Sequence, residues 1–236
     1  MDIKYFGHSA FQIDDLLIDP FISGNQKSTD DPGKIQCNLI CITHDHRDHI
    51  GDAFSIAKRT GAKIVAISEV AEKAIAGGIT VEKMGIGGTI RTGDWEIKMT
   101  PAMHSSYSGA PAGFILKKAG TTIYHAGDTA LFGDMKLIGD RGIDIAMLPI
   151  GDRFTMGVED ALTAIELIRP KIVLPMHYET FPTLTGDPKE LQRRSPVRVD
   201  ILRIGEQKTY SITGTMERLD VPEPPKHLAD PTTLKQ

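Results

Sequence analysis

THDHRDHIGD, residues 43–52, places three histidines and two aspartates in six consecutive positions directly after the apolar run LICIT. Such a run is typical of a buried strand. If the extended backbone persists past its end, His44 and His46 point to the same side, while Asp48 and His49 enter the next helix. One turn histidine is usually a surface or hydrogen-bonded residue, but four ligand-type side chains in such a turn indicate a metal site.

The composition is that of an ordinary globular chain. Its 236 residues suffice for one sizeable domain, with 25% charged and 40% hydrophobic residues. The net charge of -4 provides no broad basic surface, so we expect no nucleic acid partner. No apolar run reaches the roughly 18 to 20 residues of a membrane span. The first residues lack the pattern of a signal peptide, so we expect a cytoplasmic protein.

Two cysteines, Cys37 and Cys41, lie four positions apart in an apolar stretch. This spacing does not match the C-x-x-C pattern of redox or zinc sites. We expect both to be reduced thiols in the core.

The order of predicted elements indicates an α/β fold. Strand-like patterns cover 3–13, 16–21, 39–43, 63–67, 86–90, 95–102, 113–118, 121–127, 144–150 and 171–176. Helical patterns cover 52–60, 69–78, 158–168 and 187–194. Two αβ halves around a β-rich centre predict facing sheets with helices outside, a four-layer αββα sandwich.

We expect one domain over residues 1–216, followed by a proline-rich tail over 217–236. The tail should not form an independent helix. It lies either on the protein's own surface or against a neighbouring subunit, and the second arrangement would make the chain a homo-oligomer.

Three further polar residues stand where a predicted strand gives way to a loop. They are His104 in PAMHSS, Asp128 in YHAGDT and His177 in LPMHYE. Each alone is as easily an ordinary turn residue. Together with the cluster after residue 43 they form an inventory suited to two divalent metals with an open position for water.

The sequence resembles the metallo-β-lactamase superfamily of hydrolases through HDHRDH (44–49), His104, Asp128, His177 and the preceding Asp19. Within it, the chain is similar to a group of metal-dependent hydrolases related to the lactonase that opens ascorbate-6-phosphate. The matching stretches include GHSAF, LIDPFISGN, PAGFIL, LPIGDRFTMG and PMHYETFP, and together the matches run from about residue 3 to about residue 183.

The resemblance implies a set of metal ligands. One metal would be held by His44, His46 and His104, a second by Asp48, His49 and His177, and Asp128 would bridge them. Two metals about 3.5 to 4 Å apart can share a water and lower its pKa. Asp48 would also orient the resulting hydroxide. We expect zinc first, while manganese, nickel and iron also accept this ligand set.

Other residues are more ambiguous. The resemblance places His8 at the pocket mouth, where it either contacts substrate and donates a proton or simply caps a turn. Asp19 is the better candidate for fixing a ligand imidazole by a hydrogen bond, and His125 lies behind the ligands or packs against a strand. His227, in the tail, receives no role.

Some residues depart from the pattern of the resembling group. Asp45 and Arg47 stand where its members commonly have glycine, and Glu179 replaces asparagine in HYETFP. Arg47 either binds an anionic substrate bidentately or faces solvent.

These observations favour a hydrolase that uses a hydroxide bridged between two divalent metals. Its substrate would be a small-molecule ester, lactone, amide or phosphodiester. The alternatives are an RNA- or lipid-directed phosphodiesterase, or a metal-binding module without catalysis. No G-x-S-x-G elbow or full G-x-G-x-x-G turn indicates serine hydrolase or nucleotide chemistry.

Overall fold

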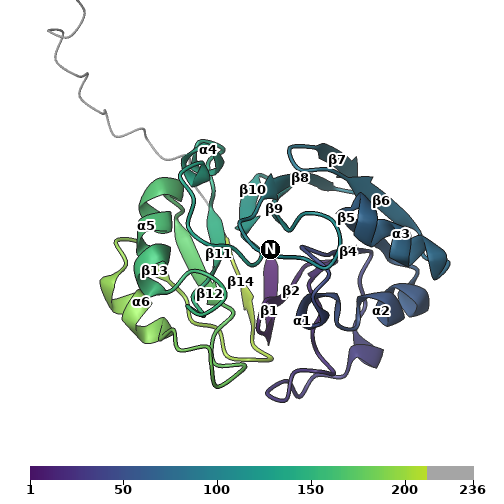
Figure 1. The fold of residues 1–236 in the computed structure, drawn as a ribbon, viewed down its shortest axis with the longest axis horizontal. Helices are drawn as coiled ribbons and strands as arrows, with labels where there is room; N and C mark the ends of the chain where they lie inside the picture. The colour runs from purple at the N-terminus through teal and green to yellow at the C-terminus, as the bar shows by residue number, and fades with distance from the viewer. Residues whose placement is uncertain (212–236) are drawn as a thin grey trace, which may run out of the picture.

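The computed structural model describes residues 1–211, which form two mixed β-sheets packed face to face (Figure 1). The predicted domain end at residue 216, the tail 217–236 and His227 lie outside the described residues.

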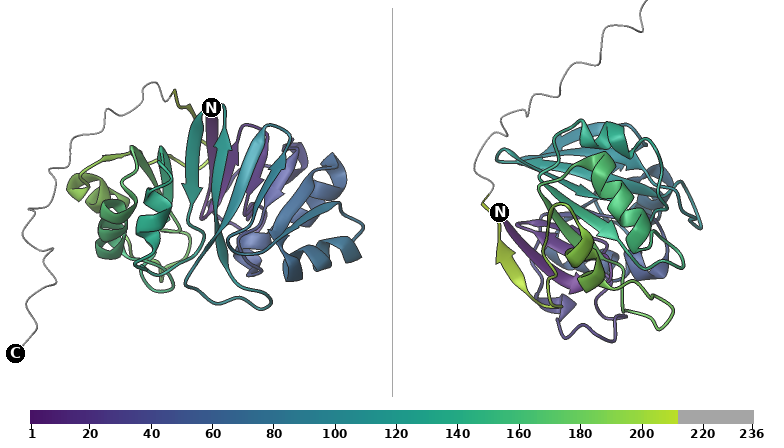
Figure 2. Two further views of the ribbon diagram at one scale, coloured as in Figure 1. Left: turned by 90° about the horizontal axis from the view of Figure 1, so that it is seen from above. Right: turned by 90° about the vertical axis from the view of Figure 1, so that its left-hand side faces the viewer.

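The first sheet has the strand order β14-β1-β2-β3-β4-β5-β6. Its strands are β1 (Asp2–Gly7), β2 (Ala10–Ile13), β3 (Leu16–Ile18), β4 (Leu39–Cys41), β5 (Lys63–Ile67), β6 (Val81–Met84) and β14 (Gln207–Thr209). Pairing is antiparallel from β14 to β3 and parallel from β3 to β6. Because of this pattern, β1, β3 and β4 run in the same direction and their carboxyl ends meet at one edge. β14 lies beside β1 near the N terminus (Figure 2).

The second sheet has the order β13-β12-β11-β10-β9-β8-β7. Its strands are β7 (Thr89–Thr92), β8 (Trp95–Pro101), β9 (Ala112–Lys118), β10 (Thr121–His125), β11 (Ile145–Pro149), β12 (Ile172–Met176) and β13 (Arg198–Val199). Pairing is antiparallel from β7 to β10 and parallel from β10 to β13. Strands β8, β10, β11 and β12 therefore share one direction.

Helices cover the outer face of each sheet, which confirms the predicted αββα layers (Figures 1 and 2). The helices are α1 (Arg47–Ile50), α2 (Ala53–Thr60), α3 (Ser68–Ala76), α4 (Met135–Gly139), α5 (Val158–Ile168) and α6 (Pro188–Arg194), with a short 3₁₀ turn, η1 (Pro32–Lys34). Helices α2 and α3 contact β5 of the first sheet, and α6 contacts β13 of the second. α5 packs between α4 and α6.

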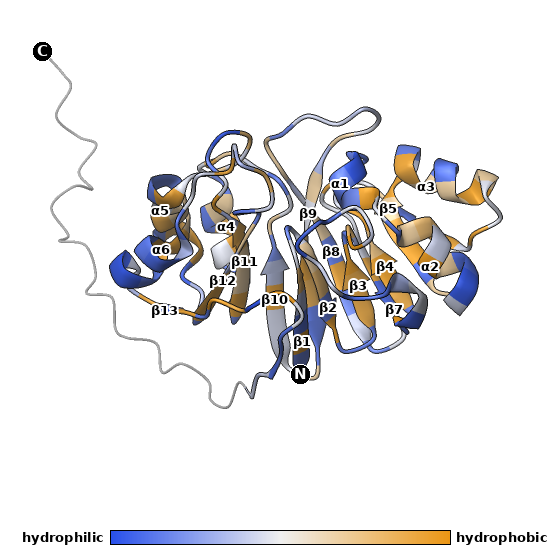
Figure 3. Cartoon of the chain, turned by 90° about the horizontal axis from the view of Figure 1, so that it is seen from below, coloured by the Kyte–Doolittle hydropathy of each residue, from blue (hydrophilic) through white to orange (hydrophobic). Residues whose placement is uncertain are grey.

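The core lies between and around the two sheets. Strands β3, β4, β11 and β12 are buried at every position, and Figure 3 shows β4 and β11 in orange. Helix α5 buries Ala161, Ala164, Ile165 and Ile168, the i, i+3, i+4, i+7 spacing of one helix face. Cys37 and Cys41 are buried free thiols, as predicted.

Elements with strong patterns match their predictions closely. The helix predicted over 52–60 is α2, which ends at Gly61 with a left-handed backbone (φ 76°). The predictions omit β6, β13, β14 and α4, and they place Asp48 and His49 at the start of the helix that follows them, whereas these residues form the separate helix α1. Strand β6 has three positions that are not fully buried, and α4 has five residues. Elements so short or exposed carry little hydrophobic periodicity, which is the signal that the prediction uses.

Within residues 1–211, none of the helices combines the length and the apolar character needed to cross a bilayer.

Candidate metal centre

The predicted ligands come together because their strands end at the same rim. His44 follows β4, His104 follows β8, Asp128 follows β10 and His177 follows β12. Two backbone hydrogen bonds join the sheets there, from Ala112 N to Thr43 O (3.0 Å) and from His177 N to His8 O (2.8 Å). Side chains more than a hundred residues apart in sequence therefore share one site.

The ligand-type side chains at this rim form three overlapping groups. Within each group the ligand atoms lie within 4.8 Å of one another. The groups are His44, His46 and His104; His8, Asp48, His49 and His177; and His44, His49 and Asp128. The first two contain the two predicted ligand triplets, with His8 added to the second. The assignment of these residues as ligands stays a prediction.

Asp128 lies at the centre of the site. Its Oδ2 is 2.9 Å from His177 Nε2, 3.3 Å from His49 Nε2 and 3.6 Å from His104 Nε2. These histidines belong to both predicted triplets. This is the position required of a bridging carboxylate.

The turn that presents Asp128 requires glycine at position 127. Gly127 has a φ of +63°, and a Cβ there would lie 2.5 Å from Ala112 O. A side chain is therefore excluded both by the backbone conformation and by the adjacent strand.

Asp19 is a buried carboxylate behind the ligands. It accepts hydrogen bonds from Thr43 N (2.8 Å), Thr43 Oγ1 (2.6 Å) and His49 Nδ1 (2.8 Å). The sequence predicted a hydrogen bond between Asp19 and one of the candidate ligand imidazoles without specifying which, and the structure places it at His49. Thr43 Oγ1 also lies 3.0 Å from His44 Nδ1. Asp19 thus orients the imidazole of His49 directly and that of His44 through Thr43, which leaves the Nε2 of His49 facing Asp128 and the Nε2 of His44 2.9 Å from His46 Nδ1.

The donor set fits divalent metal ions. His49 Nε2 and Asp128 Oδ1 are buried atoms without a hydrogen-bond partner, although buried polar atoms are nearly always partnered. Imidazole nitrogens with carboxylate oxygens are ligands that zinc and related transition ions accept.

Electrostatics at the site favour neutral imidazoles at His44 and His104 but a protonated imidazole at His49. Burial lowers the pKa of His44 to about 2 and also lowers the pKa of His104. Burial alone would lower the pKa of His49 too, but the carboxylates of Asp128 and Asp19 outweigh it and raise that pKa well above its usual value. A metal taking the Nε2 of His49 would therefore displace a proton.

His8 does not lie at the pocket mouth, which corrects the expectation from the resemblance. Its side chain is fully buried. Its Nδ1 atom lies 3.1 Å from Thr180 Oγ1, and its Nε2 atom lies 3.2 Å from Asp48 Oδ2. The centroid of its ring lies 4.0 Å from the centroid of the His177 ring. Burial, with His177 adjacent, lowers the pKa of His8 to about 4. The residue follows β1 directly, and only the sheet topology places β1 beside the rim.

Asp45 has a role that sequence reasoning missed. Its carboxylate is fully buried and accepts from Ser106 Oγ (2.7 Å), Tyr107 N (2.6 Å) and Ser108 Oγ (2.7 Å), with Lys73 Nζ at 2.5 Å. Burial alone would raise the pKa of Asp45, but these hydrogen bonds lower it well below its usual value. Asp45 therefore anchors the loop 102–111, which carries His104, against helix α3.

Replacing Asp45 by asparagine is expected to lower the free energy of unfolding by about 1–3 kcal/mol, because an amide N–H would face the donors Lys73 and Ser108. The measurement is urea unfolding of the metal-free protein. The matched control is Asp134→Asn, at the exposed start of α4. Equal unfolding midpoints for the two variants would show that Asp45 is not an anchor.

The remaining polar residues lie around these ligands. His125 donates from Nε2 to Ser9 O (3.0 Å) and accepts at Nδ1 from Gly127 N (3.2 Å), and its ring lies 5.9 Å from that of Phe11, so it packs against β2 and the turn before it in the other sheet. Arg47 is exposed at the cavity that opens on the site. Glu179 is exposed, with Lys27 Nζ 3.8 Å away.

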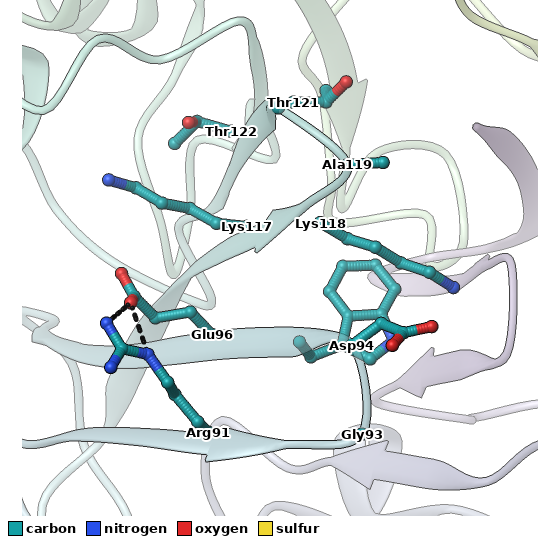
Figure 4. A pocket seen from close by; sticks show the side chains of 11 residues that line it. Arg91, Gly93, Asp94, Glu96, Lys117, Lys118, Ala119, Thr121 and Thr122 are labelled. Atoms are coloured by element: carbon teal, nitrogen blue, oxygen red, sulfur yellow. Dashed lines mark hydrogen bonds and ion pairs between the residues drawn. The ribbon is translucent and has the colours of Figure 1, made fainter.

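A cavity of about 350 Å³ opens onto the ligands. Its wall includes His46, Asp48, His104, Asp128 and His177, so ligands from both predicted triplets face it. A second hollow lies at the turns that join β7 to β8 and β9 to β10 (Figure 4). That hollow is at the opposite ends of β9 and β10, and its wall holds an Arg91–Glu96 ion pair but none of the ligand groups.

Comparison with known families agrees with this geometry. Residues 15–178 match the model of the beta-lactamase superfamily domain. A UPF0173 metal-dependent hydrolase of Methanosarcina barkeri is 46% identical over 221 residues, which cover 86% of this chain and 96% of the relative. Another, of Pyrobaculum calidifontis, is 49% identical over 207 residues, with 82% and 91% coverage.

A solved structure is also similar. Igni18, a metallo hydrolase of the hyperthermophilic archaeon Ignicoccus hospitalis, matches with a TM-score of 0.85 and 39% identity. The match covers 90% of this chain and 99% of that one.

Proposed function

The chain belongs to the beta-lactamase superfamily, among its metal-dependent hydrolases, and we propose that it hydrolyses a small-molecule ester, lactone or phosphodiester with two divalent metal ions. The first ion would be held by His44, His46 and His104 and the second by Asp48, His49 and His177, with Asp128 shared. Zinc is the first candidate, since imidazole and carboxylate ligands suit it. When bound, such a pair supplies a shared, activated hydroxide and neutralises developing negative charge.

The position of Asp128 is the observation that supports this proposal most. A carboxylate within 3.6 Å of histidines from both triplets offsets the repulsion expected between two cations. The cavity beside it supplies the second support. A structural metal site is usually closed by protein ligands, whereas a catalytic one keeps an open position.

Asp48 and His8 would act as a pair. Burial alone would raise the pKa of Asp48, but His8 and His49 lower it well below its usual value, so its carboxylate is ionised. Asp48 lines the cavity, and its ionised carboxylate would accept a hydrogen bond that orients the attacking water. His8 lies behind it, and we assign it the role of fixing the orientation of the Asp48 carboxylate.

The test is hydrolysis by protein purified without chelator. We expect it to contain about two equivalents of metal and to hydrolyse p-nitrophenyl acetate, a γ-lactone or bis(p-nitrophenyl) phosphate. Chelator treatment should abolish that hydrolysis, and zinc or manganese should restore it. Protein that holds its metal but hydrolyses no member of the panel would instead be a binding module.

A further inference from the structure

The cavity over the ligands gathers the exposed aromatic side chains of the molecule. Tyr107 is 74% exposed, Phe154 57% and Phe181 40%. They are the only aromatic side chains classed as exposed within residues 1–211, and all three line this cavity.

The three rings come from three separate loops. Tyr107 lies on the loop between β8 and β9, Phe154 between β11 and α5, and Phe181 between β12 and α6. The Tyr107 ring packs edge-on against His46 (4.9 Å) and the Phe181 ring against His8 (5.6 Å). The sequence does not predict that these three loops lie side by side, because they are far apart in the chain and come together only at the rim of the folded protein.

Exposed aromatic rings lose the free energy that burial would provide, about 25 cal/mol per Å² of apolar surface. Such rings gathered at one concave site indicate a ligand that covers them. A volume of about 350 Å³ is at the low end of the roughly 300–1,000 Å³ typical of small-molecule sites. The occupant is therefore small, and not an extended polymer.

On these grounds, and resting on the proposed function, we propose that the substrate carries an aryl group beside the bond that is cleaved. That group would pack among Tyr107, Phe154 and Phe181, while the metal ligands face the reacting atoms. Aromatic rings pack well at centroid distances of about 4.5–7 Å in edge-on or offset geometry.

The experiment compares phenylphosphonate with methylphosphonate, two probes that share one metal-binding head. Both are titrated calorimetrically into zinc-loaded protein of measured metal content. Phenylphosphonate should bind with a Kd at least about tenfold lower than that of methylphosphonate, because the phenyl group buries additional apolar surface. Equal affinities, or no binding of either probe, would overturn the aryl site.

Two variants test whether the preference for phenylphosphonate arises in this cavity. Phe154→Ser removes a rim ring that makes no ring contact with a proposed ligand, so metal content should be unchanged while the phenyl preference falls about three- to tenfold. Leu137→Ser, at a side chain 62% exposed on α4 and outside this cavity, should keep the full preference. A preference that survives Phe154→Ser would contradict the assignment.

Hydrolysis of phenyl acetate and methyl acetate by the same preparation separates the two proposals. Phenylphosphonate preference without hydrolysis of any ester, lactone or phosphodiester would retain the aryl site and refute the hydrolase. Hydrolysis without a phenyl preference in binding would support the hydrolase and refute the aryl site.

Discussion

Asp128→Ala is expected to abolish binding at both metal positions at once. The parent should hold about two equivalents, and the variant should retain less than one after dialysis. Its kcat/KM on any substrate of the parent should fall by more than about 100-fold, since outer-sphere substitutions alone reach that loss. The physical reason is the position of the Asp128 carboxylate, within 3.6 Å of histidines from both triplets.

Metal content by plasma mass spectrometry and steady-state kinetics check this result. Asp134→Ala, at the exposed start of α4, is the control and should match the parent. If the Asp128 variant kept one tightly bound equivalent with unchanged affinity, the bridging role would be wrong, and the shared-hydroxide mechanism with it.

Asp19→Asn is expected to weaken metal binding by about 10- to 100-fold without removing a ligand. The Oδ2 atom of Asp19 lies 2.8 Å from His49 Nδ1 and 2.6 Å from Thr43 Oγ1. An amide N–H in its place turns the Nδ1 of His49 from donor to acceptor. The single proton of the neutral ring then stays on Nε2, the atom that must bind metal. Asparagine also tolerates the left-handed backbone of residue 19 (φ 42°), so alanine would be a poorer test.

The measurement is competition for cobalt or zinc against a chromogenic chelator. Asp144→Asn is a matched control, because Asp144 is also a buried carboxylate, accepts from Thr122 N (2.8 Å) and lies before β11, away from the rim. Both variants should lose stability, and only Asp19→Asn should lose metal affinity. Equal metal affinity in the two variants would mean that Asp19 does not set the tautomer of His49.

One face of the site is open to the cavity, which favours a catalytic site over a site that only stores metal. Asp48 and His104 are half-buried, and both line the cavity, whereas His44 and His49 are fully buried. The ligand cluster is therefore closed from behind by Asp19 and Thr43 and open in front. Such asymmetry is expected of a site that exchanges substrate.

Much of the fold could be predicted from the sequence because the patterns that indicate strands and helices are local. Apolar runs gave β4, β5, β11 and β12, and helical periodicity gave α2 and α5 within a residue or two. The motif 44–49 could be interpreted as a metal site for the same reason. Its ligands lie on one turn, so chain geometry alone keeps them close.

The candidate ligands that are distant in sequence could be predicted only in part. His104, Asp128 and His177 were selected because each follows a strand, and parallel strands bring their carboxyl ends to one edge. His8 also follows a strand, but the predicted strand 3–13 ran through it, so the end of β1 was not recognised. The argument does not apply to Asp45. The loop anchored by Asp45 lies more than sixty residues away in sequence, and no local pattern marks such a pairing.

The sequence by itself determined the layers, the ligand types and the direction in which the strands present them, because periodicity and adjacency act over a few residues. Only the tertiary structure decided that His8 is buried behind Asp48, that Asp45 holds the loop 102–111, and that Tyr107, Phe154 and Phe181 surround one cavity. The physical reason is that these contacts depend on how two sheets pack and where three loops cross the rim. Packing of that kind follows from the whole core and not from any one segment.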